Sequence, residues 1–469
     1  MQTSLRGIAD KAARDKTHTF QNLIQLLTRE FLRYCWSFIN RRAAAGVDRE
    51  SAYHYAQHLE NNLAELAARV KGGGYRAKLV LRKHIPKLNG KWRPLGIPAT
   101  ADKVLQMAVA KILEAIYEQD FLANSFGYRP GTGAHSAIEE LSAVLREGRY
   151  RWVVEADIKG FFDHIDHSRL MDLLRQRIDD RPFLNLIQKW LKAGILDTDG
   201  QVIHPITGTP QGGIVSPILA NVYLHHALDV WFENIVKPQC QGSAYLCRYA
   251  DDFVCVFEDE SDARRFYQAL PERLAQYGLE IAAEKTNLIR FDQFAKTRFD
   301  FLGFEFRWGL NRWRRPVLKR RTARNKYRAS IASLRQWFQT HCSLPKAELF
   351  AKLNVKLRGY WNYYGIRGNY ESLSDYFYQI TRELFKGLNR RSQRKRLYKN
   401  SNYPSRSLKT LETTLALCEF VAALIDLKPD KHVRHSRSVF ARNLYSSAEI
   451  DQARRKFFRW PNHTAVIPA

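Results

Sequence analysis

The hydrophobic pattern at the start of the chain is helical. Within residues 1 to about 55, apolar residues such as Ile24 and Leu27 recur three or four positions apart among charged residues, which places them on one face of a helix. A second helix is predicted from Leu59 to Val70. The glycines at 72–74 supply its C-cap and a flexible turn, since no lysine follows them at the spacing of a phosphate-binding loop.

Strand-like runs alternate with helices through the middle of the chain. Residues 79–87 and 92–98 flank Asn89-Gly90, a dipeptide that favours tight turns, and they predict a β-hairpin. Thr100 is predicted to cap the helix that follows, and another helix is expected near residues 134–145. Because strands and helices alternate in this way, the predicted fold class is α/β or α+β.

Two adjacent carboxylates interrupt a second predicted hairpin. Strand-forming residues fill 244–247 and 253–257, and Tyr249-Ala250-Asp251-Asp252 lies between them. Two such aspartates repel each other by roughly 4 kcal/mol at about 4 Å when the effective dielectric constant is about 20, so a partly buried pair needs a cation or a protonation change. On a solvated turn the repulsion falls to about 1 kcal/mol, and the pair then needs no functional explanation.

A third aspartate favours the functional interpretation. Asp157 ends another strand-like run, residues 152–156, and three aspartates at strand ends and a hairpin tip can converge as one cluster of oxygen ligands. Two Mg²⁺ ions held by such a cluster suit phosphoryl transfer, because one activates an attacking 3′-hydroxyl while the other neutralises the leaving pyrophosphate. The pattern therefore predicts metal-dependent phosphoryl transfer.

The charge of the chain indicates a polyanionic partner. Lys and Arg number 75 against 47 Asp and Glu, which gives a formal net charge of +28. The basic residues are spread among aromatic residues along the chain and are not confined to one amphipathic helix, so nucleic acid is favoured over a membrane surface. The six cysteines form no C-x-x-C pair, which argues against a zinc module. The first residues contain no apolar leader, so an intracellular protein is expected.

Two further stretches carry candidate binding groups. Gly212 and Gly213 open an apolar helix that runs to about Trp231, and they let the backbone pass close to a ligand, although taken alone they are better explained as an ordinary loop and helix start. From about residue 312 the sequence predicts basic helices, which include Lys319-Arg320-Arg321. Aromatic residues among these basic ones suit either stacking platforms for nucleic acid or the core of a helical unit. Those aromatic residues are Tyr360, Trp361 and Tyr364.

Six blocks in one order resemble a known family. They are RPLGIP at 93–98, NSFGYRPG at 124–131, ADIKGFFDHI at 156–165, GTPQGGIVSPILAN at 208–221, YADD at 249–252 and FLGF at 301–304. Together they resemble the reverse-transcriptase blocks of group II intron-encoded proteins, and RGYWNYYG and LNRRSQRK resemble that family's thumb or maturase region. The resemblance covers roughly residues 40 to 400.

The resemblance implies a right-hand polymerase with an antiparallel palm sheet packed on helices. Together with the composition of the two ends, it divides the chain into a helical N-terminal extension expected to bind RNA, fingers and palm, a helical thumb or maturase region, and a C-terminal region that matches the family's DNA-binding region only in being basic. The corresponding ranges are 1–55, 56–311, 312–400 and 401–469. The paired cysteines of the family's endonuclease domain are missing, so cleavage of a target strand by this chain is not expected.

The resemblance also assigns roles to individual residues. Asp157, Asp251 and Asp252 are implied as catalytic, metal-binding carboxylates, with Ile158 in the metal-binding set and Lys285 as the general acid toward pyrophosphate. Phe162 is implied as an aromatic steric gate against a 2′-hydroxyl. Positions that contact the nucleotide, template or primer complete the set: Lys87, Arg93, Gln211, Tyr249, Ala250, Phe301, Leu302 and Gly303.

The implied activity is RNA-directed DNA synthesis with two Mg²⁺ ions, for which Mn²⁺ can substitute. The implied partners are dNTPs, a DNA or RNA primer, an RNA template and a structured intron or other non-coding RNA, in the cytoplasm of a bacterium or with its nucleoid. Two alternatives remain open at this point. One is an RNA-binding splicing maturase whose polymerase activity is dispensable, and the other is a polymerase used in phage defence or DNA repair.

Overall fold

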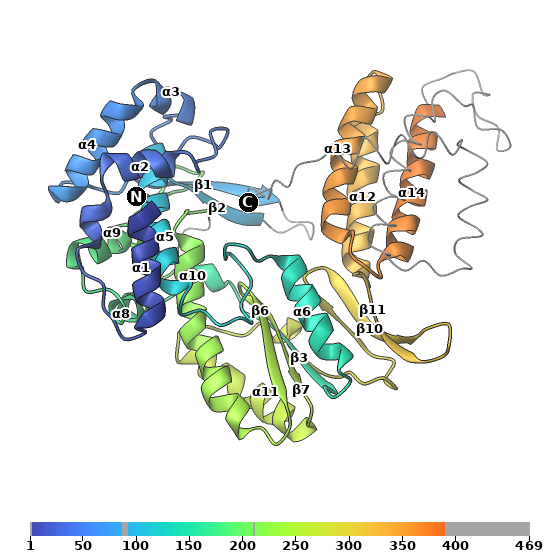
Figure 1. The fold of residues 1–469 in the computed structure, drawn as a ribbon. Coiled ribbons are helices and arrows are strands. Elements are labelled where there is room, and N and C mark those ends of the chain that lie inside the picture. Colours follow the sequence, from blue (N-terminus) through green and yellow to red (C-terminus); the bar gives the residue numbers. More distant parts are fainter. Residues whose placement is uncertain (1, 87–91, 210–211, 390–469) are drawn as a thin grey trace. The chain divides into compact units, whose positions relative to one another are not determined.

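The computed structural model describes residues 2–86, 92–209 and 212–389 (Figure 1). The chain divides into two compact units, Met1–Lys319 and Arg320–Ala469. The first unit combines helices with mainly antiparallel sheets, and the described part of the second is a group of helices after the last strand. A mixed helical and antiparallel architecture is therefore confirmed.

The N-terminal helices pack around one long buried helix. Thr28 caps the second of them by accepting a hydrogen bond from the Phe31 backbone N–H, and the fourth ends at Gly72, as the glycines predicted. Helix α5 is buried along most of its length and contacts α1 and α2. The bounds are α1 Gln2–Arg14, α2 Arg29–Trp36, α3 Ala52–Gln57, α4 Leu59–Lys71 and α5 Thr100–Tyr117.

The predicted capping role of Thr100 is wrong. The N-cap position of α5 is Ala99, which makes no side-chain cap, and Thr100 is the first residue of the helix. The hydroxyl of Thr100 is buried and donates a hydrogen bond of 2.7 Å to the carbonyl oxygen of Glu50. Thr100 lies one position inside the helix, so its side chain is not at the N-cap position from which a hydroxyl accepts from the first helix N–H groups.

The predicted hairpin at residues 79–98 is present in the first sheet. Strands β1 and β2 pair antiparallel, and the predicted turn at Asn89-Gly90 lies outside the described residues. Strand β4 adds to β1 in parallel, which gives the order β2-β1-β4-β5. The bounds are β1 Val80–Pro86, β2 Trp92–Ile97, β4 Ile195–Leu196 and β5 Val202–Ile203.

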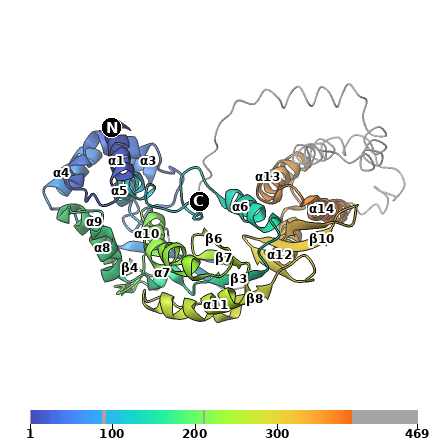
Figure 2. The same ribbon diagram turned by 60° about the horizontal axis from the view of Figure 1, so that its bottom comes forward.

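The central sheet has the antiparallel order β6-β7-β3-β8, with helices on both faces (Figure 2). Its strands are β3 Trp152–Asp157, β6 Ala244–Tyr249, β7 Asp252–Phe257 and β8 Asn287–Arg290. On one face the ring of Phe257 packs 5.3 Å from that of Phe266 in α11. On the other face the Cys247 thiol donates a hydrogen bond to the Ala137 carbonyl in α6.

The remaining helices of the first unit pack on this sheet, on one another or on the N-terminal segments. The apolar helix predicted after Gly213 begins at Ser216 and continues past Leu224 through π-helical turns at His225–Asp229 and Phe232–Val236. The bounds are α6 Ala134–Arg146, α7 Phe161–His164, α8 His167–Arg175, α9 Arg181–Leu191, α10 Ser216–Leu224 and α11 Glu260–Ala275.

The basic run Lys319-Arg320-Arg321, predicted to be helical, lies in a strand instead. It belongs to β11 Pro316–Thr322, which joins β10 Phe304–Leu310 and β9 Arg298–Phe301 in a third sheet. Side chains along β11 alternate between partly and fully buried, and Arg320 is among the buried ones. Its guanidinium donates a hydrogen bond of 3.0 Å to the Arg367 carbonyl. Because one of the buried positions of this strand is an arginine, the sequence does not show the alternation of apolar and polar residues that marks a strand.

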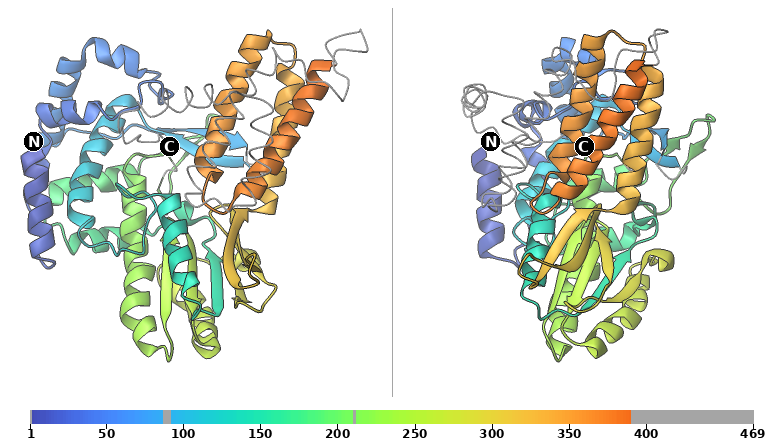
Figure 3. Two further views of the ribbon diagram at one scale, coloured as in Figure 1. Left: turned by 45° about the vertical axis from the view of Figure 1, so that its right-hand side comes forward. Right: turned by 90° about the vertical axis from the view of Figure 1, so that its right-hand side faces the viewer.

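Up to residue 389, the second unit contains three helices that lie alongside one another (Figure 3): α12 Arg324–His341, α13 Lys346–Tyr364 and α14 Tyr370–Asn389. Tyr360 and Trp361 are buried in its core, and the Tyr360 ring stacks on Tyr376 with a centroid separation of 3.7 Å. The core interpretation is thus confirmed for these two aromatic residues. The described helices include none with the length and apolar character needed to cross a membrane.

Candidate active site

The predicted hairpin with an acidic tip is present in the central sheet. Strands β6 and β7 are joined by the two-residue turn Ala250-Asp251, and Tyr249 pairs with Asp252 across it. Ala250 has a φ of 56°, in the left-handed region, and it is buried. Asp251 therefore lies on the turn itself, and Asp252 is the first residue of the returning strand.

Strand β3 brings the third aspartate to this hairpin. Asp157 is the last residue of β3, and its Cα pairs directly with that of Asp252 in the antiparallel register. Side chains of directly paired residues lie on the same face of a sheet, so the two carboxylates share one face. The structure thus brings together two residues that are far apart in the sequence, as their positions at strand ends predicted.

The electrostatics of Asp251 show which groups surround it. Burial raises the pKa of the Asp251 carboxyl, and the neighbouring Asp157 raises it further. Arg93 and Lys285 act in the opposite direction, because positive charges favour the carboxylate. Two carboxylates and two cations, contributed by four separate segments, therefore gather at the turn.

Lys285 contacts one of the predicted metal ligands directly. It ends a short 3₁₀ helix, Ala283–Lys285, and its ammonium forms an ion pair with the Asp157 carboxylate. This hydrogen bond raises the pKa of Lys285, which keeps the ammonium protonated. The Asp157 carbonyl is fixed as well, since it accepts a hydrogen bond of 2.8 Å from the Ala282 N–H.

The donor chemistry of the site fits a hard divalent cation, but the ligand set is not closed. No three His, Cys, Asp or Glu side chains come together as a metal-binding group in the described ranges. The available donors are carboxylate oxygens, which Mg²⁺ prefers, and the repulsion between Asp157 and Asp251 is a cost that a cation relieves. Ile158, predicted in the same set, is buried and bridges to Ile281.

The other predicted substrate residues have separate positions. Phe162 lies in α7 and is 7% exposed, and Arg93 lies in β2 opposite Ile85. The predictions for Lys87 and Gln211 fall outside the described residues. Phe301 ends β9, and Leu302 and Gly303 form the turn to β10 with φ values of 49° and 77°. Strand β9 contacts β3 and β7, so this turn belongs to a sheet next to the central one.

Comparison with known proteins matches the two units separately. Residues 85–306 match the family model "Reverse transcriptase (RNA-dependent DNA polymerase)", and residues 327–403 match "Group II intron, maturase-specific domain". Protein YkfC of Escherichia coli is 35% identical over 283 residues, which are 54% of this chain and 74% of that protein. The chain belongs to the group II intron reverse transcriptase and maturase family.

Two further relatives of this chain are intron proteins by name. The group II intron-encoded protein LtrA of Lactococcus lactis is 31% identical over 405 residues, 68% of this chain and 66% of that protein. An uncharacterized 91 kDa protein in the cob intron of Schizosaccharomyces pombe is 46% identical over 151 residues, 32% of this chain and 18% of that protein. The chain therefore spans about two thirds of the length of the Lactococcus relative.

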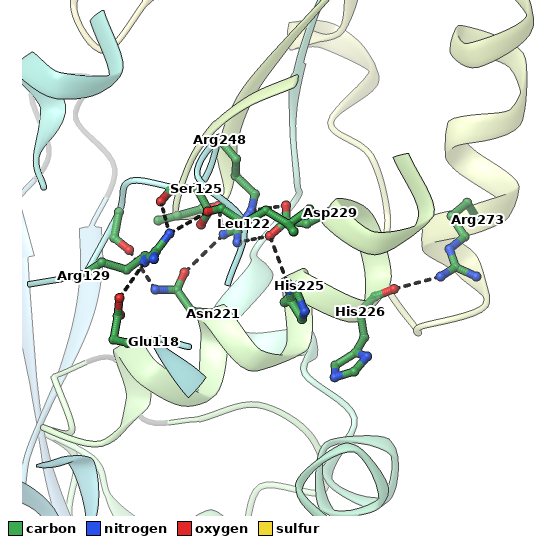
Figure 4. A network of polar contacts seen from close by, with 12 residues as sticks. Glu118, Leu122, Ser125, Arg129, Asn221, His225, His226, Asp229, Arg248 and Arg273 are labelled. Atoms are coloured by element: carbon green, nitrogen blue, oxygen red, sulfur yellow. Dashed lines mark hydrogen bonds and ion pairs between the residues drawn. The ribbon is translucent and has the colours of Figure 1, made fainter. Parts of the chain in front are cut away.

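A buried ion pair anchors the acidic hairpin at the end of β6 (Figure 4). Arg248 precedes Tyr249 in β6, and its guanidinium binds the Asp229 carboxylate with two hydrogen bonds, of 2.7 and 2.5 Å. Both side chains are fully buried. Burial disfavours the charged carboxylate, but the Arg248 guanidinium and the His225 side chain together outweigh it and hold the pKa of Asp229 below its ordinary value.

The same guanidinium reaches the turn. Its Nη1 donates hydrogen bonds of 3.1 Å to the Ala250 carbonyl and to the Asn221 side-chain oxygen. Asp229 ends a π-helical turn, an irregularity that is frequent at functional sites. This network was not predicted from the sequence, although an arginine within the apolar run of β6 signals the need for a buried partner.

His226, in the same π-helical turn, makes the stability of the protein depend on pH. Burial, together with the neighbouring His225, lowers the pKa of His226 from 6.5 to about 4. The unfolded chain binds a proton at this imidazole below about pH 6.5, whereas the folded chain does so only near pH 4, so stability falls as pH falls through this window.

We expect His226→Gln to remove about 2 kcal/mol of the loss in unfolding free energy between pH 7 and pH 4.5. Urea denaturation of the wild type and the variant at both pH values measures this difference. An identical pH dependence in the two proteins would show that His226 titrates normally.

Proposed function

We propose that this protein is an RNA-directed DNA polymerase that extends a primer 3′-hydroxyl with dNTPs on an RNA template. The observation that carries the proposal is the pairing of Asp157 with Asp252 beside Asp251 on the turn. The reverse-transcriptase match over residues 85–306 includes all three aspartates and supports the same reaction. In this proposal the chain comprises an N-terminal extension, fingers and palm, a thumb and a basic C-terminal region, at 1–55, 56–311, 312–400 and 401–469.

The three aspartates are proposed to hold two Mg²⁺ ions, with Ile158 beside them and Mn²⁺ as a substitute. When bound, the ions activate the 3′-hydroxyl and neutralise charge on the pyrophosphate. Arg93 and Lys87 are proposed to bind the triphosphate, and Phe162 to exclude a 2′-hydroxyl. The remaining proposed contacts with nucleotide, template and primer are those of Gln211, Tyr249, Ala250, Phe301, Leu302 and Gly303.

Lys285 is proposed to donate a proton to the leaving pyrophosphate. Its hydrogen bond to Asp157 raises the pKa of the ammonium, so the proton is present at Nζ under neutral conditions. More than half of the side chain is exposed, which leaves it able to turn toward a substrate. A general acid needs both the proton and this access.

A splicing role is the second candidate, and the maturase-specific match over residues 327–403 favours it. LtrA is by name a group II intron-encoded protein, and we propose that this chain likewise binds a structured intron RNA. If splicing is the main role, a protein with Asp251→Asn and Asp252→Asn still promotes it. Loss of splicing in that folded variant contradicts a polymerase-independent role. A defence or repair polymerase remains the third candidate, for which the DNA around the reading frame should lack intron RNA domains.

The polymerase proposal is tested by primer extension on an RNA template with dNTPs and Mg²⁺. Extension that requires all three components supports it, and no extension by the folded protein contradicts it.

The net charge of +28 predicts that RNA binding depends on salt, because displaced counterions drive binding of basic proteins to nucleic acid. We expect RNA affinity to fall on the order of 10³-fold between 50 and 200 mM salt. Filter binding across that range measures the slope, and a flat response excludes phosphate contacts as the main source of affinity.

A further inference from the structure

A short segment of chain lies against the acidic hairpin. Residues 124–128 run beside the end of β6, where the Phe126 N–H donates to the Arg248 carbonyl and the Arg248 N–H donates to the Asn124 carbonyl, both at 2.9 Å. Arg129 closes the loop on itself by donating to the Leu122 and Ser125 carbonyls at 2.7 Å (Figure 4). The position of this segment is therefore fixed relative to the turn at Ala250.

Gly127 is the point of closest approach. A Cβ atom on this residue would lie only 2.3 Å from the Ala250 backbone nitrogen, so no larger residue fits without moving the turn. The Gly127 carbonyl accepts a hydrogen bond of 2.7 Å from the Asn221 side chain, which itself accepts one from Arg248. The buried network that holds the hairpin thus also holds Gly127.

The next residue, Tyr128, has an unusual backbone. Its φ is 59°, in the left-handed region that residues other than glycine rarely adopt. Such a conformation persists only where the surroundings enforce it. Here the hydrogen bonds of Gly127 on one side and of Arg129 on the other hold the backbone of Tyr128 in place. The result is a tyrosine that the fold holds in one direction despite the strain.

That direction places the Tyr128 ring at the candidate active site. The ring meets Phe162 edge to face, with centroids 6.3 Å apart and planes at 73°. Tyr128 is 42% exposed and Phe162 only 7%, so Tyr128 presents the larger accessible surface of the pair. Burial and the Asp251 carboxylate raise the pKa of Tyr128, while Arg93 opposes them, so its phenol lies within the field of the predicted catalytic groups.

We propose that Tyr128 is a specificity-determining residue that forms a second wall of the nucleotide sugar site, together with Phe162. Its ring limits the movement of Phe162 and narrows the space beside the sugar, so a ribonucleotide is rejected by the pair and not by Phe162 alone. This inference rests on the proposed polymerase function. It assigns the role to the aromatic ring and not to the hydroxyl, because the contact with Phe162 is made by the ring.

The test compares dNTP and rNTP incorporation by Tyr128→Ala, Tyr128→Phe and Tyr128→Gly. We expect Tyr128→Ala and Tyr128→Gly to lower the ratio of kcat/KM for dNTP over rNTP about tenfold, mainly through a lower KM for the rNTP. Tyr128→Phe retains the ratio. Tyr378→Ala, which removes a 65% exposed tyrosine from α14, is the matched control and leaves the ratio unchanged.

The glycine variant separates this role from a purely structural one. Glycine adopts the left-handed conformation without strain, so Tyr128→Gly should unfold at a temperature no lower than Tyr128→Ala. If Tyr128 only supports the fold, Tyr128→Gly keeps the wild-type ratio, and that result overturns the proposal.

A binding measurement distinguishes this failure from failure of the proposed function. The dissociation constants of dATP and ATP are measured with the protein on a template and primer, without turnover. If the wild type is inactive but prefers dATP, and Tyr128→Ala loses that preference, the sugar-site proposal stands while the polymerase proposal fails. Equal preference in the two proteins overturns the sugar-site proposal.

Discussion

Replacement of Asp251 by asparagine should lower the rate of primer extension on the order of 10³-fold or more. The change removes a charged ligand from the turn, and metal-assisted stabilisation of developing charge contributes several kcal/mol, at about 1.4 kcal/mol per factor of ten. The same change should raise the stability of the metal-free protein at neutral pH. Burial and Asp157 raise the pKa of Asp251, so its ionised form destabilises the fold and the neutral amide does not.

Opposite effects on activity and stability make this result specific. Single-turnover extension measures the first, and urea denaturation without divalent ions measures the second. Asp199→Asn, on an exposed loop, is the matched control and should leave both unchanged. An active Asp251→Asn protein would remove the basis of the polymerase proposal, and a less stable one would mean that the carboxylate contributes more to the fold through hydrogen bonds than it costs through repulsion.

Replacement of Arg248 by methionine should cost about 3–5 kcal/mol of unfolding free energy. The variant leaves the Asp229 carboxylate buried without the two hydrogen bonds that compensate for its desolvation, and a buried charge without its partner carries a penalty of this size. The carbonyl of Ala250 also loses its donor, so the turn loosens. Activity should therefore fall by more than the loss of folded protein explains.

The double variant Arg248→Met/Asp229→Leu distinguishes the charge from the packing. Removing both charges should recover most of the stability, because no unpaired ion remains, while activity stays low since the turn is still without its donor. Chemical denaturation and primer extension on the two variants test this. Stability that is no higher in the double variant than in Arg248→Met would mean that shape, and not charge, is what the pair supplies.

The parts of the site predictable from the sequence were those marked by local patterns. Two runs rich in strand-forming residues around Asp251 predicted the hairpin, and an apolar run that ends at Asp157 predicted a strand end. The pairing of Asp157 with Asp252 could not be derived from either pattern, because strand register depends on contacts between distant segments. The positions of the three aspartates at strand ends and at a hairpin tip predicted that they can converge, and the structure supplies the register.

Other features could not be predicted because polar side chains form hydrogen bonds with distant segments of the chain. Arg320 belongs to a basic run that is typical of an exposed helix, but it lies buried in β11, where it donates a hydrogen bond to a backbone carbonyl. Thr100 is a residue type that often caps helices, but its hydroxyl donates a hydrogen bond to the Glu50 carbonyl. Asp229 reaches Arg248 from a π-helical turn, which shifts side chains relative to a regular helix and has no simple sequence signature. In each case tertiary contacts outweighed local propensity.

Alternation along β6 separates two kinds of requirement. Cys247 and Tyr249 face one side of the central sheet with Asp252, and Arg248 faces the other, toward Asn221 and Asp229. Neighbouring positions in β6 therefore have different roles: Tyr249 lies on the face of the candidate site, and Arg248 holds the hairpin to Asn221 and Asp229 from the other face. A substitution on one face can therefore leave the contacts made from the other face in place.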